Sequence, residues 1–232
     1  MIKNKIAQII ASETISELHN FVKVGMNEKE IGEKALELMT LKGSNSWWYH
    51  GIGVLVLLGK RSVLSLSGRE MFASEESRVA ENDVITIDVA PTVDGFWGDY
   101  ARTLFVEDGK VAIEDAPQNP LFRKGLEAEL YLHNKLMEIA TLEMTYEQLF
   151  FQLNAEITKL GFENLDFHGN LGHTIEIDQA DRVYIELGST RSFKEVGKLF
   201  TLEPHIRVSG GEIGFKREDI YYFDDNGLIQ RL

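Results

Sequence analysis

The sequence predicts an α+β fold built from two related halves, residues 5–110 and 119–228. Two observations lead to this prediction. In each half, apolar residues recur first at the spacing of amphipathic helices and later at the spacing of strands. The order of these patterns repeats, so that Gly43 and Gly161, which close the second helix of each half, are 118 residues apart. Because such a repeat indicates duplicated units, we expect one domain over residues 1–232 with a curved antiparallel sheet formed by both halves.

Each half opens with two predicted helices. In the first half, apolar residues at helical spacing indicate a helix over residues 5–22. A second helix begins at Asn27, where Glu30 three residues later completes the pattern of a capping box. The second half repeats this order with a helix over residues 119–140 and another that begins at Thr145. We expect the apolar stripes of these helices to pack in the core.

Each half ends in two predicted strands joined by a turn. In the first half, strands over residues 84–90 and 97–106 flank an Asp-Gly dipeptide at 94–95, which is typical of hairpin turns. In the second half, the strands cover residues 199–208 and 214–223. Acidic residues are disfavoured in strands and are seldom buried without a partner. The two hairpins nevertheless carry four of them at corresponding places: Asp88, Asp99, Glu203 and Glu218.

Four converging carboxylates predict a bound cation, because carboxylates held close together cannot all stay ionised. His173, in a glycine-rich turn, adds an imidazole, and a shell of oxygen atoms with one imidazole suits Mn, Fe, Co or Zn. Two divalent ions about 3.5–4 Å apart would activate water for hydrolysis. The alternative is a network of ion pairs on the strands, for which the sequence offers four basic partners: Arg102, Arg207, Lys216 and Arg217.

Composition excludes several other classes of function. The chain has no cysteine, which excludes disulfides, thiolate metal sites and a cysteine nucleophile and predicts a cytoplasmic location. A net charge of −13 argues against a nucleic-acid surface, which needs clustered lysine and arginine. No apolar run approaches the ~20 residues that span a bilayer, so we expect no membrane partner. The acidity suits a cationic ligand, such as a metal ion or the amino terminus of a peptide.

As a set, these residues resemble the signature of the pita-bread metallopeptidases, a group that includes methionine aminopeptidase, aminopeptidase P, prolidase and the creatinase relatives. The resemblance covers essentially all 232 residues and corresponds to the catalytic domain of that group. It implies the pita-bread fold and a peptidase activity. Five short elements carry it: Thr86-Ile-Asp-Val89, Gly98-Asp-Tyr-Ala-Arg-Thr103, Leu171-Gly-His173, Phe200-Thr-Leu-Glu-Pro204 and Arg217-Glu-Asp219.

The resemblance also implies a role for each expected ligand. Asp99 and Glu218 would bridge two divalent metal ions. Asp88 would chelate one ion, and His173 with Glu203 would hold the other. Glu203 would also serve as general base. Manganese is the first choice of metal, with cobalt, zinc and iron as the alternatives.

Two histidines that are usual in this group are absent. One usually precedes the first aspartate, where residues 65–70 contain no histidine, and the other usually follows the ligand histidine, where residues 176–180 contain none. Those histidines bind substrate and handle protons. Two replacements are available in this chain. His50 follows three aromatic residues, and His205 lies two residues from Glu203 and therefore on the same face of its strand.

These observations give a primary expectation and two alternatives. The primary expectation is a dinuclear-metal aminopeptidase that hydrolyses the N-terminal peptide bond of peptides with a free amino terminus, Xaa-Pro peptides among them. Glu203 would act as general base, and His50 or His205 would stabilise the developing charge. The first alternative is a pita-bread module that has lost catalysis and binds peptides or protein partners. The second is an activity like that of methionine aminopeptidase. The sequence leaves open whether the chain forms a homodimer.

Overall fold

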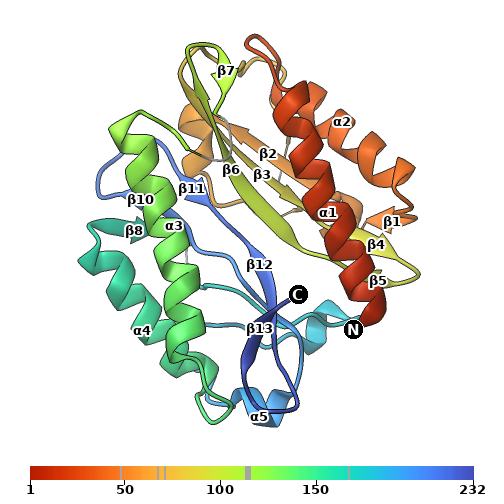
Figure 1. Cartoon of the computed structure of the whole chain (residues 1–232), viewed down its shortest axis with the longest axis vertical. Coiled ribbons are helices and arrows are strands. Elements are labelled where there is room, and N and C mark those ends of the chain that lie inside the picture. The colour runs from red at the N-terminus through yellow and green to blue at the C-terminus, as the bar shows by residue number, and fades with distance from the viewer. Residues whose placement is uncertain (48, 67, 71, 113–115, 167) are drawn as a thin grey trace.

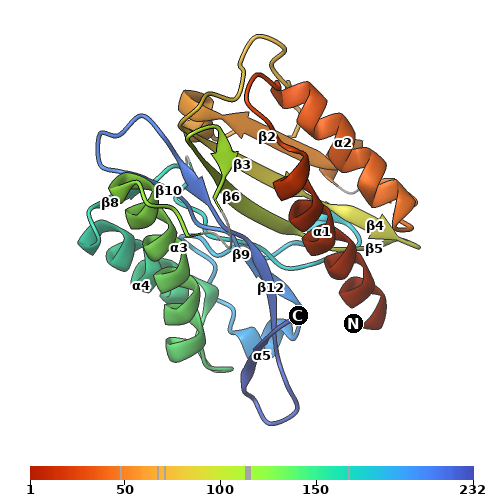
Figure 2. The same cartoon turned by 45° about the horizontal axis from the view of Figure 1, so that its top comes forward.

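Two pairs of helices flank the strands of this chain. The computed structural model describes residues 1–47, 49–66, 68–70, 72–112, 116–166 and 168–232. Helices α1 (Ile2–Phe21) and α2 (Glu28–Leu41) lie on one outer side of the strands, and α3 (Pro120–Ile139) and α4 (Tyr146–Lys159) lie on the other (Figure 1 and Figure 2). Among the described helices, none combines the length and the apolar character that a membrane crossing requires.

The signals that start the second helix of each half are confirmed. At α2, the side chain of Asn27 accepts a hydrogen bond from the backbone nitrogen of Glu30, and the Glu30 carboxylate accepts one from the backbone nitrogen of Asn27. Thr145 and Gln148 form the same reciprocal pair at α4. Each box satisfies backbone donors that a helix end otherwise leaves without a partner.

The strands of the first half form two antiparallel sheets. The larger has the order β2-β3-β6-β7 and contains β2 (Val54–Leu58), β3 (Asp83–Val89), β6 (Tyr100–Glu107) and β7 (Lys110–Val111). The smaller has the order β1-β4-β5 and contains β1 (Ser46–Trp47), β4 (Pro91–Val93) and β5 (Phe96–Trp97). The expected hairpin is therefore present, with its tip in the smaller sheet. Asp94 and Gly95 form the turn with φ values of 52° and 80°.

The second half also has two antiparallel sheets. One has the order β11-β10-β8 and contains β8 (Phe162–Asn164), β10 (His205–Val208) and β11 (Phe215–Lys216). The other has the order β13-β12-β9 and contains β9 (Phe200–Leu202), β12 (Asp219–Phe223) and β13 (Ile229–Arg231). Short helical segments connect the strands of both halves: α5 (Phe193–Val196), η1 (Tyr49–Gly51), η2 (Gly59–Val63) and η4 (Gln179–Asp181).

The two halves meet where β6 runs beside the segment that joins β11 to β12. The backbone nitrogen of Glu218 donates to the carbonyl oxygen of Ala101 at 3.0 Å, and Ala101 donates back at 3.4 Å. Two residues further along β6, the hydroxyl of Thr103 accepts a hydrogen bond from the backbone nitrogen of Lys216 at 2.8 Å. The antiparallel surface therefore continues from one half into the other.

Two apolar cores hold the strands against the helices. In the first half, Leu18 of α1 and Ile31 of α2 pack with Ile85 and Ile87 of β3, and all four are fully buried. Each such side chain stabilises the fold by about 1.5–3 kcal/mol. Because neighbouring residues on a strand point to opposite faces, Asp88 points away from these helices. The core of the second half combines aliphatic residues with a group of buried aromatic side chains: Tyr146, Phe193, Phe200, Phe215 and Tyr221.

Candidate metal centre

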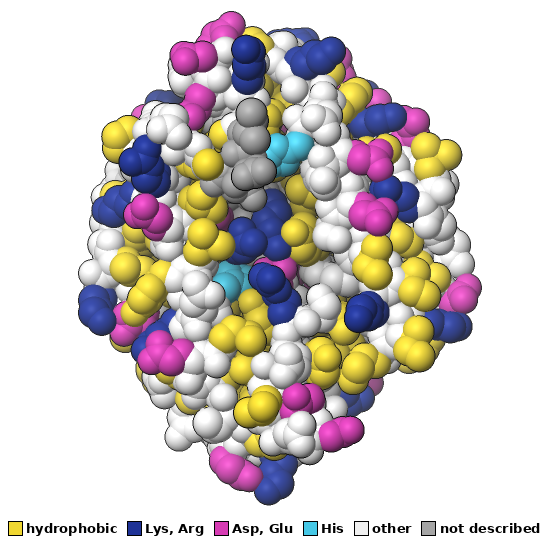
Figure 3. Space-filling view, in the orientation of Figure 1, with side chains coloured by type: hydrophobic (Ala, Val, Ile, Leu, Met, Phe, Trp, Pro, Cys, Tyr) yellow, Lys and Arg dark blue, Asp and Glu magenta, His cyan; other side chains and the backbone are white. Residues whose placement is uncertain are grey.

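The five residues expected to bind metal line one cavity of about 430 Å³. Asp88 lies on β3, Asp99 directly precedes β6, and Glu218 lies between β11 and β12. His173 and Glu203 come from irregular segments beside β9. Figure 3 shows the hollow near the centre of this face, where basic, acidic and histidine side chains gather. The expectation that these residues converge from both halves therefore agrees with the structure.

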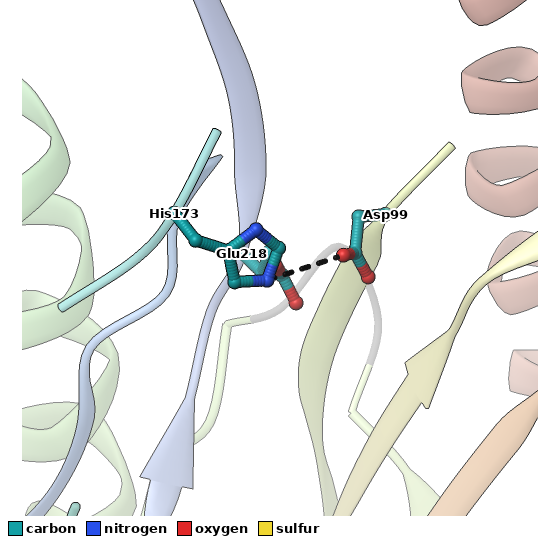
Figure 4. Close-up of side chains that lie close together, drawn as sticks. All are labelled: Asp99, His173 and Glu218. Atoms are coloured by element: carbon teal, nitrogen blue, oxygen red, sulfur yellow. Dashed lines mark ion pairs between the residues drawn. The ribbon is translucent and has the colours of Figure 1, made fainter. Parts of the chain in front are cut away.

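Asp99, His173 and Glu218, here named the convergent triad, lie closest together. One donor atom of each lies within 4.8 Å of the others, and all three residues are buried. Figure 4 shows the three side chains pointing toward one another, with Nε2 of His173 3.9 Å from Oδ2 of Asp99. Two carboxylates and one imidazole are a donor set that suits a divalent transition metal. The convergent triad is therefore the part of the cavity best arranged to hold an ion.

Helix α1 positions Asp99 through its backbone. Gln8, buried on α1, donates from Nε2 to the carbonyl oxygen of Asp99 and accepts at Oε1 from the backbone nitrogen of Asp99, both at 2.9 Å. The helix can come this close because residue 98 is glycine. A Cβ on Gly98 would lie 2.7 Å from the backbone carbon of Ala7. The first helix of the chain thus fixes the backbone of a candidate ligand.

A glycine and two threonines orient His173. Gly172 has a φ of 148°, and a Cβ there would collide with the carbonyl oxygen of Thr201. The Nδ1 atom of His173 lies 3.1 Å from the carbonyl oxygen of Thr174 and donates to it, which leaves Nε2 as a lone-pair donor. Burial, and then Arg182, lower the pKa of His173 to about 3. The imidazole is therefore neutral at pH 7, as a metal ligand must be.

The two carboxylates of the convergent triad need a positive charge. Burial, followed by repulsion from neighbouring carboxylates, raises the pKa of Asp99 and that of Glu218 well above their ordinary values. Among the described residues, none donates a hydrogen bond to either carboxylate oxygen of Glu218. Leaving a buried polar group without a partner costs about 1–3 kcal/mol, and more for a charged group. A divalent ion would relieve both penalties, so the donors present here fit one.

Lys216 contacts the rest of the acidic cluster. Its Nζ atom lies 2.5 Å from Oδ2 of Asp88, 3.2 Å from Oε2 of Glu203 and 3.8 Å from Oε2 of Glu218. Burial alone would lower the pKa of the Lys216 ammonium, but these carboxylates raise it well above its ordinary value. The other oxygen of Glu203, Oε1, lies 3.5 Å from Nε2 of His173. Ion pairing, the alternative to metal binding, is thus present around Asp88 and Glu203.

The remaining basic candidates do not take part in this cluster. Arg102, Arg207 and Arg217 pair with acidic residues outside it. Lys216 is therefore the one member of that set whose ion pairs lie inside the cavity. Its position two residues before Glu218 on an extended segment was the sequence signal for this placement, because such residues share a face.

The structure separates the two candidate histidines. His205, on β10, lines the cavity and donates from Nε2 to the carbonyl oxygen of Ser62 at 2.6 Å. Burial lowers the pKa of His205 to about 4, so it is neutral at pH 7, and its Nδ1 carries a lone pair that can accept a hydrogen bond. His50 lies in η1 with a φ of 56°, is exposed, and is not among the described residues that line the cavity. Residue 48, in the aromatic run before it, lies outside the described residues.

Two features of the cavity were not predicted. Arg182 lines it, with its guanidinium carbon 5.6 Å and 5.9 Å from the ring centres of Trp97 and Tyr184. This arginine directly follows η4 and lies in an irregular stretch, where no periodic pattern indicated it. The cavity also has an apolar wall: Leu55, Leu57, Leu64 and Leu66. This wall could have been expected once the strands were paired. Leu55 pairs with Asp88 in the sheet, and paired residues share a face.

Comparison with known sequences gives one family. The model of metallopeptidase family M24 matches residues 3–225. An uncharacterized peptidase of Schizosaccharomyces pombe is 22% identical over 212 residues, which are 90% of this chain and 43% of that protein. The chain therefore spans less than half the length of that relative.

Three solved structures share the fold across 99% of this chain. X-Pro aminopeptidase from Thermotoga maritima has a TM-score of 0.79, 22% identity and 59% of its own length covered. Prolidase from Pyrococcus furiosus has a TM-score of 0.78, 22% identity and 62% covered. Methionine aminopeptidase from Thermotoga maritima has a TM-score of 0.76, 15% identity and 94% covered. These likenesses confirm the α+β fold of pita-bread type that the sequence predicts.

Proposed function

We propose that this chain, which belongs to metallopeptidase family M24, is a metal-dependent aminopeptidase that hydrolyses the N-terminal bond of peptides. The observation that carries the proposal is the convergent triad, a buried group of two carboxylates and one neutral imidazole. Glu218, whose oxygen atoms accept no hydrogen bond from the described residues, has the surroundings expected of a metal ligand. We propose manganese first, because oxygen donors outnumber the single nitrogen. The number of metal ions that the site can hold depends on Lys216, because its ammonium group contacts two of the expected ligands.

An ion held by the convergent triad would supply Lewis-acid chemistry, which activates water and polarises a carbonyl. Glu203 is the proposed general base. Its side chain is one-fifth exposed in the cavity, and its Oε1 lies 3.5 Å from Nε2 of the ligand histidine. It is therefore close to the ion-binding group and still accessible to water, as proton removal requires.

Two further residues of the cavity could form hydrogen bonds with a substrate at its scissile bond. Arg182 is a permanent cation, and we propose that it donates hydrogen bonds to the oxygen atom on which negative charge develops. His205 is neutral at pH 7 and its Nε2 proton is engaged by Ser62. We therefore propose that Nδ1 of His205 accepts a proton or a hydrogen bond from the substrate. His50, exposed on η1, is the less favoured replacement.

The proposed substrate is a peptide with a free amino terminus. The excess of negative charge, −13 over the chain, attracts an ammonium group. The leucine wall can contact an apolar first side chain. Xaa-Pro peptides are the first choice, because two of the similar structures are an X-Pro aminopeptidase and a prolidase. Peptides that begin with methionine are the second choice, because a methionine aminopeptidase is covered over 94% of its length.

One observation favours a second candidate function. Lys216 already neutralises part of the acidic cluster. If this cation leaves no place for any metal, the chain is a pita-bread module that binds peptides without hydrolysing them. In that case a peptide with a free amino terminus would bind the metal-free protein and remain intact.

A peptide panel tests the proposed function. The protein is stripped with chelator, reconstituted with Mn²⁺, and offered Xaa-Pro peptides, methionine-initiated peptides and the same peptides with acetylated amino termini. We expect hydrolysis of free peptides only, with metal only, and Xaa-Pro peptides fastest. Equal turnover by the metal-free protein would contradict a metal-dependent mechanism. Equal turnover of acetylated peptides would contradict an aminopeptidase.

A further inference from the structure

Lys216 brings a positive charge of the protein's own into the metal site. Its ammonium nitrogen contacts Asp88 at 2.5 Å and Glu203 at 3.2 Å, whereas its contact with Glu218 is longer, 3.8 Å. Asp88 and Glu203 are the two expected ligands that lie outside the convergent triad. The expected ligand set is therefore divided into two clusters, and one of them already holds a cation.

The backbone of Lys216 is fixed on both edges. Strand β11 pairs with β10, where Lys216 lies opposite His205. On the other edge, the backbone nitrogen of Lys216 donates to the hydroxyl of Thr103 at 2.8 Å. The preceding residue, Phe215, is fully buried in the core. Because neighbouring residues of a strand point to opposite faces, the Lys216 side chain is directed toward the cavity.

The charges of the site favour a single divalent ion. Four carboxylates carry four negative charges: Asp88, Asp99, Glu203 and Glu218. The ammonium and one divalent ion supply three positive charges, which leaves these four carboxylates with one negative charge in excess. A second divalent ion would bring the positive charge to five and would lie against the ammonium, where like charges repel strongly in a buried site. It would have to displace Lys216 from Asp88 while the lysine backbone stays paired.

We propose that Lys216 takes the place of a second metal ion, so that the site binds one divalent ion at the convergent triad. This inference rests on the proposed metal-dependent function and deepens it by giving the number of ions. Glu203 faces both cations, since Oε1 lies near His173 and Oε2 lies near Lys216. Asp88 is then the partner of Lys216 and not a metal ligand.

The metal content of the parent and of Lys216→Met tests the inference. Each protein is stripped with chelator, dialysed against Mn²⁺, desalted and analysed for manganese per chain. We expect one ion in the parent and two in Lys216→Met, a twofold rise, because methionine keeps an unbranched side chain, one atom shorter than that of lysine, without its charge. Electron paramagnetic resonance of the same samples should show an isolated Mn²⁺ in the parent and an exchange-coupled pair in the variant.

Two further variants complete the design. Lys60→Met is the matched control, because Lys60 pairs with Glu212 at 2.8 Å on the exposed surface, and its removal should leave one ion per chain. Asp88→Asn covers the case in which Lys216→Met does not fold. If Asp88 only holds the lysine, Asp88→Asn keeps the one ion of the parent.

The outcomes separate this inference from the proposed function. Two ions per parent chain, one ion per folded Lys216→Met chain, or loss of the ion in Asp88→Asn would overturn the inference and leave a metal-dependent function standing. A parent that binds none of Mn²⁺, Co²⁺, Zn²⁺ and Fe²⁺ would overturn the proposed function and the inference together.

Discussion

Gln8 on α1 makes two 2.9 Å hydrogen bonds to the backbone of Asp99, one as donor and one as acceptor. The amide side chain of Gln8 thus makes the pair of backbone hydrogen bonds that a neighbouring strand would otherwise make. It does so between the end of β5 and the start of β6. The helix can approach this closely because a Cβ on Gly98 would lie 2.7 Å from the backbone carbon of Ala7. The geometry of the metal centre therefore depends on the first helix.

Gln8→Ala should weaken both the fold and the metal centre. The substitution leaves a buried backbone donor and acceptor at Asp99 without partners, which costs about 1–3 kcal/mol of the free energy of unfolding. Loss of a group that orients a ligand typically lowers metal affinity by about 10–100-fold. Urea unfolding and Mn²⁺ titration measure the two effects. Ser16→Ala, at an exposed position of α1, is the control and should change neither quantity.

The stability of the fold should fall between pH 7 and pH 5 because of His133. Burial lowers the pKa of this histidine from 6.5 to about 3, and its ring contacts the Tyr221 hydroxyl at 2.8 Å. In this pH range the unfolded chain binds a proton that the folded chain does not, so stability rises with pH and is lost on acidification. The expected loss from this residue is about 2 kcal/mol. The free energy of unfolding of His133→Gln should depend less on pH by that amount; equal pH dependence would contradict the assignment.

His205→Ala and His50→Ala should differ in activity. His205 lines the cavity, whereas His50 is exposed on η1. We expect His205→Ala to lower kcat by roughly 10²-fold, the scale of a group that transfers protons, with metal content unchanged. His50→Ala should retain most of its activity. A larger loss of kcat in His50→Ala than in His205→Ala would assign the proton-transfer role to His50.

Arg182→Met should lower kcat and leave metal content unchanged. Its guanidinium lines the cavity beside Tyr184, where it can donate to a developing oxyanion. Removal of one such donor costs roughly 10²–10³-fold in kcat. Arg123→Met, at an exposed position of α3, serves as control. A change in KM alone would show that Arg182 binds the substrate equally well before and during the reaction.

Local signals explain what the sequence could predict of the fold. The capping boxes at Asn27 and Thr145 are complete within four residues, and both helices begin where these signals place them. The first helix was expected over residues 5–22 but covers Ile2–Phe21. Its N-cap, Met1, makes no side-chain hydrogen bond, so the sequence carries no start signal there.

The site was predictable where it follows the repeat and not where it depends on tertiary pairing. Asp99 and Glu218 occupy corresponding places in two hairpins, which is why their convergence could be expected. The sequence offered Lys216 as an ion-pair partner on the same face as Glu218. It did not show which carboxylates Lys216 contacts, because those contacts require β11 to lie between β10 and Thr103 of the other half. Arg182 lies in an irregular segment where neither helical nor strand periodicity applies.

Thermal unfolding of the parent and of Asp99→Asn, each with chelator and with Mn²⁺, tests the central claim that the convergent triad binds a divalent ion. A ligand at a hundredfold excess over its Kd stabilises the folded chain by ~2.7 kcal/mol, or roughly 5–10 °C in Tm for a chain of this size. Asp99→Asn removes a ligand and one of the mutually repelling charges. The Mn²⁺-induced rise in Tm should therefore vanish, while the metal-free variant is no less stable than the metal-free parent. A parent whose Tm does not respond to Mn²⁺, Co²⁺, Zn²⁺ or Fe²⁺ would contradict the account.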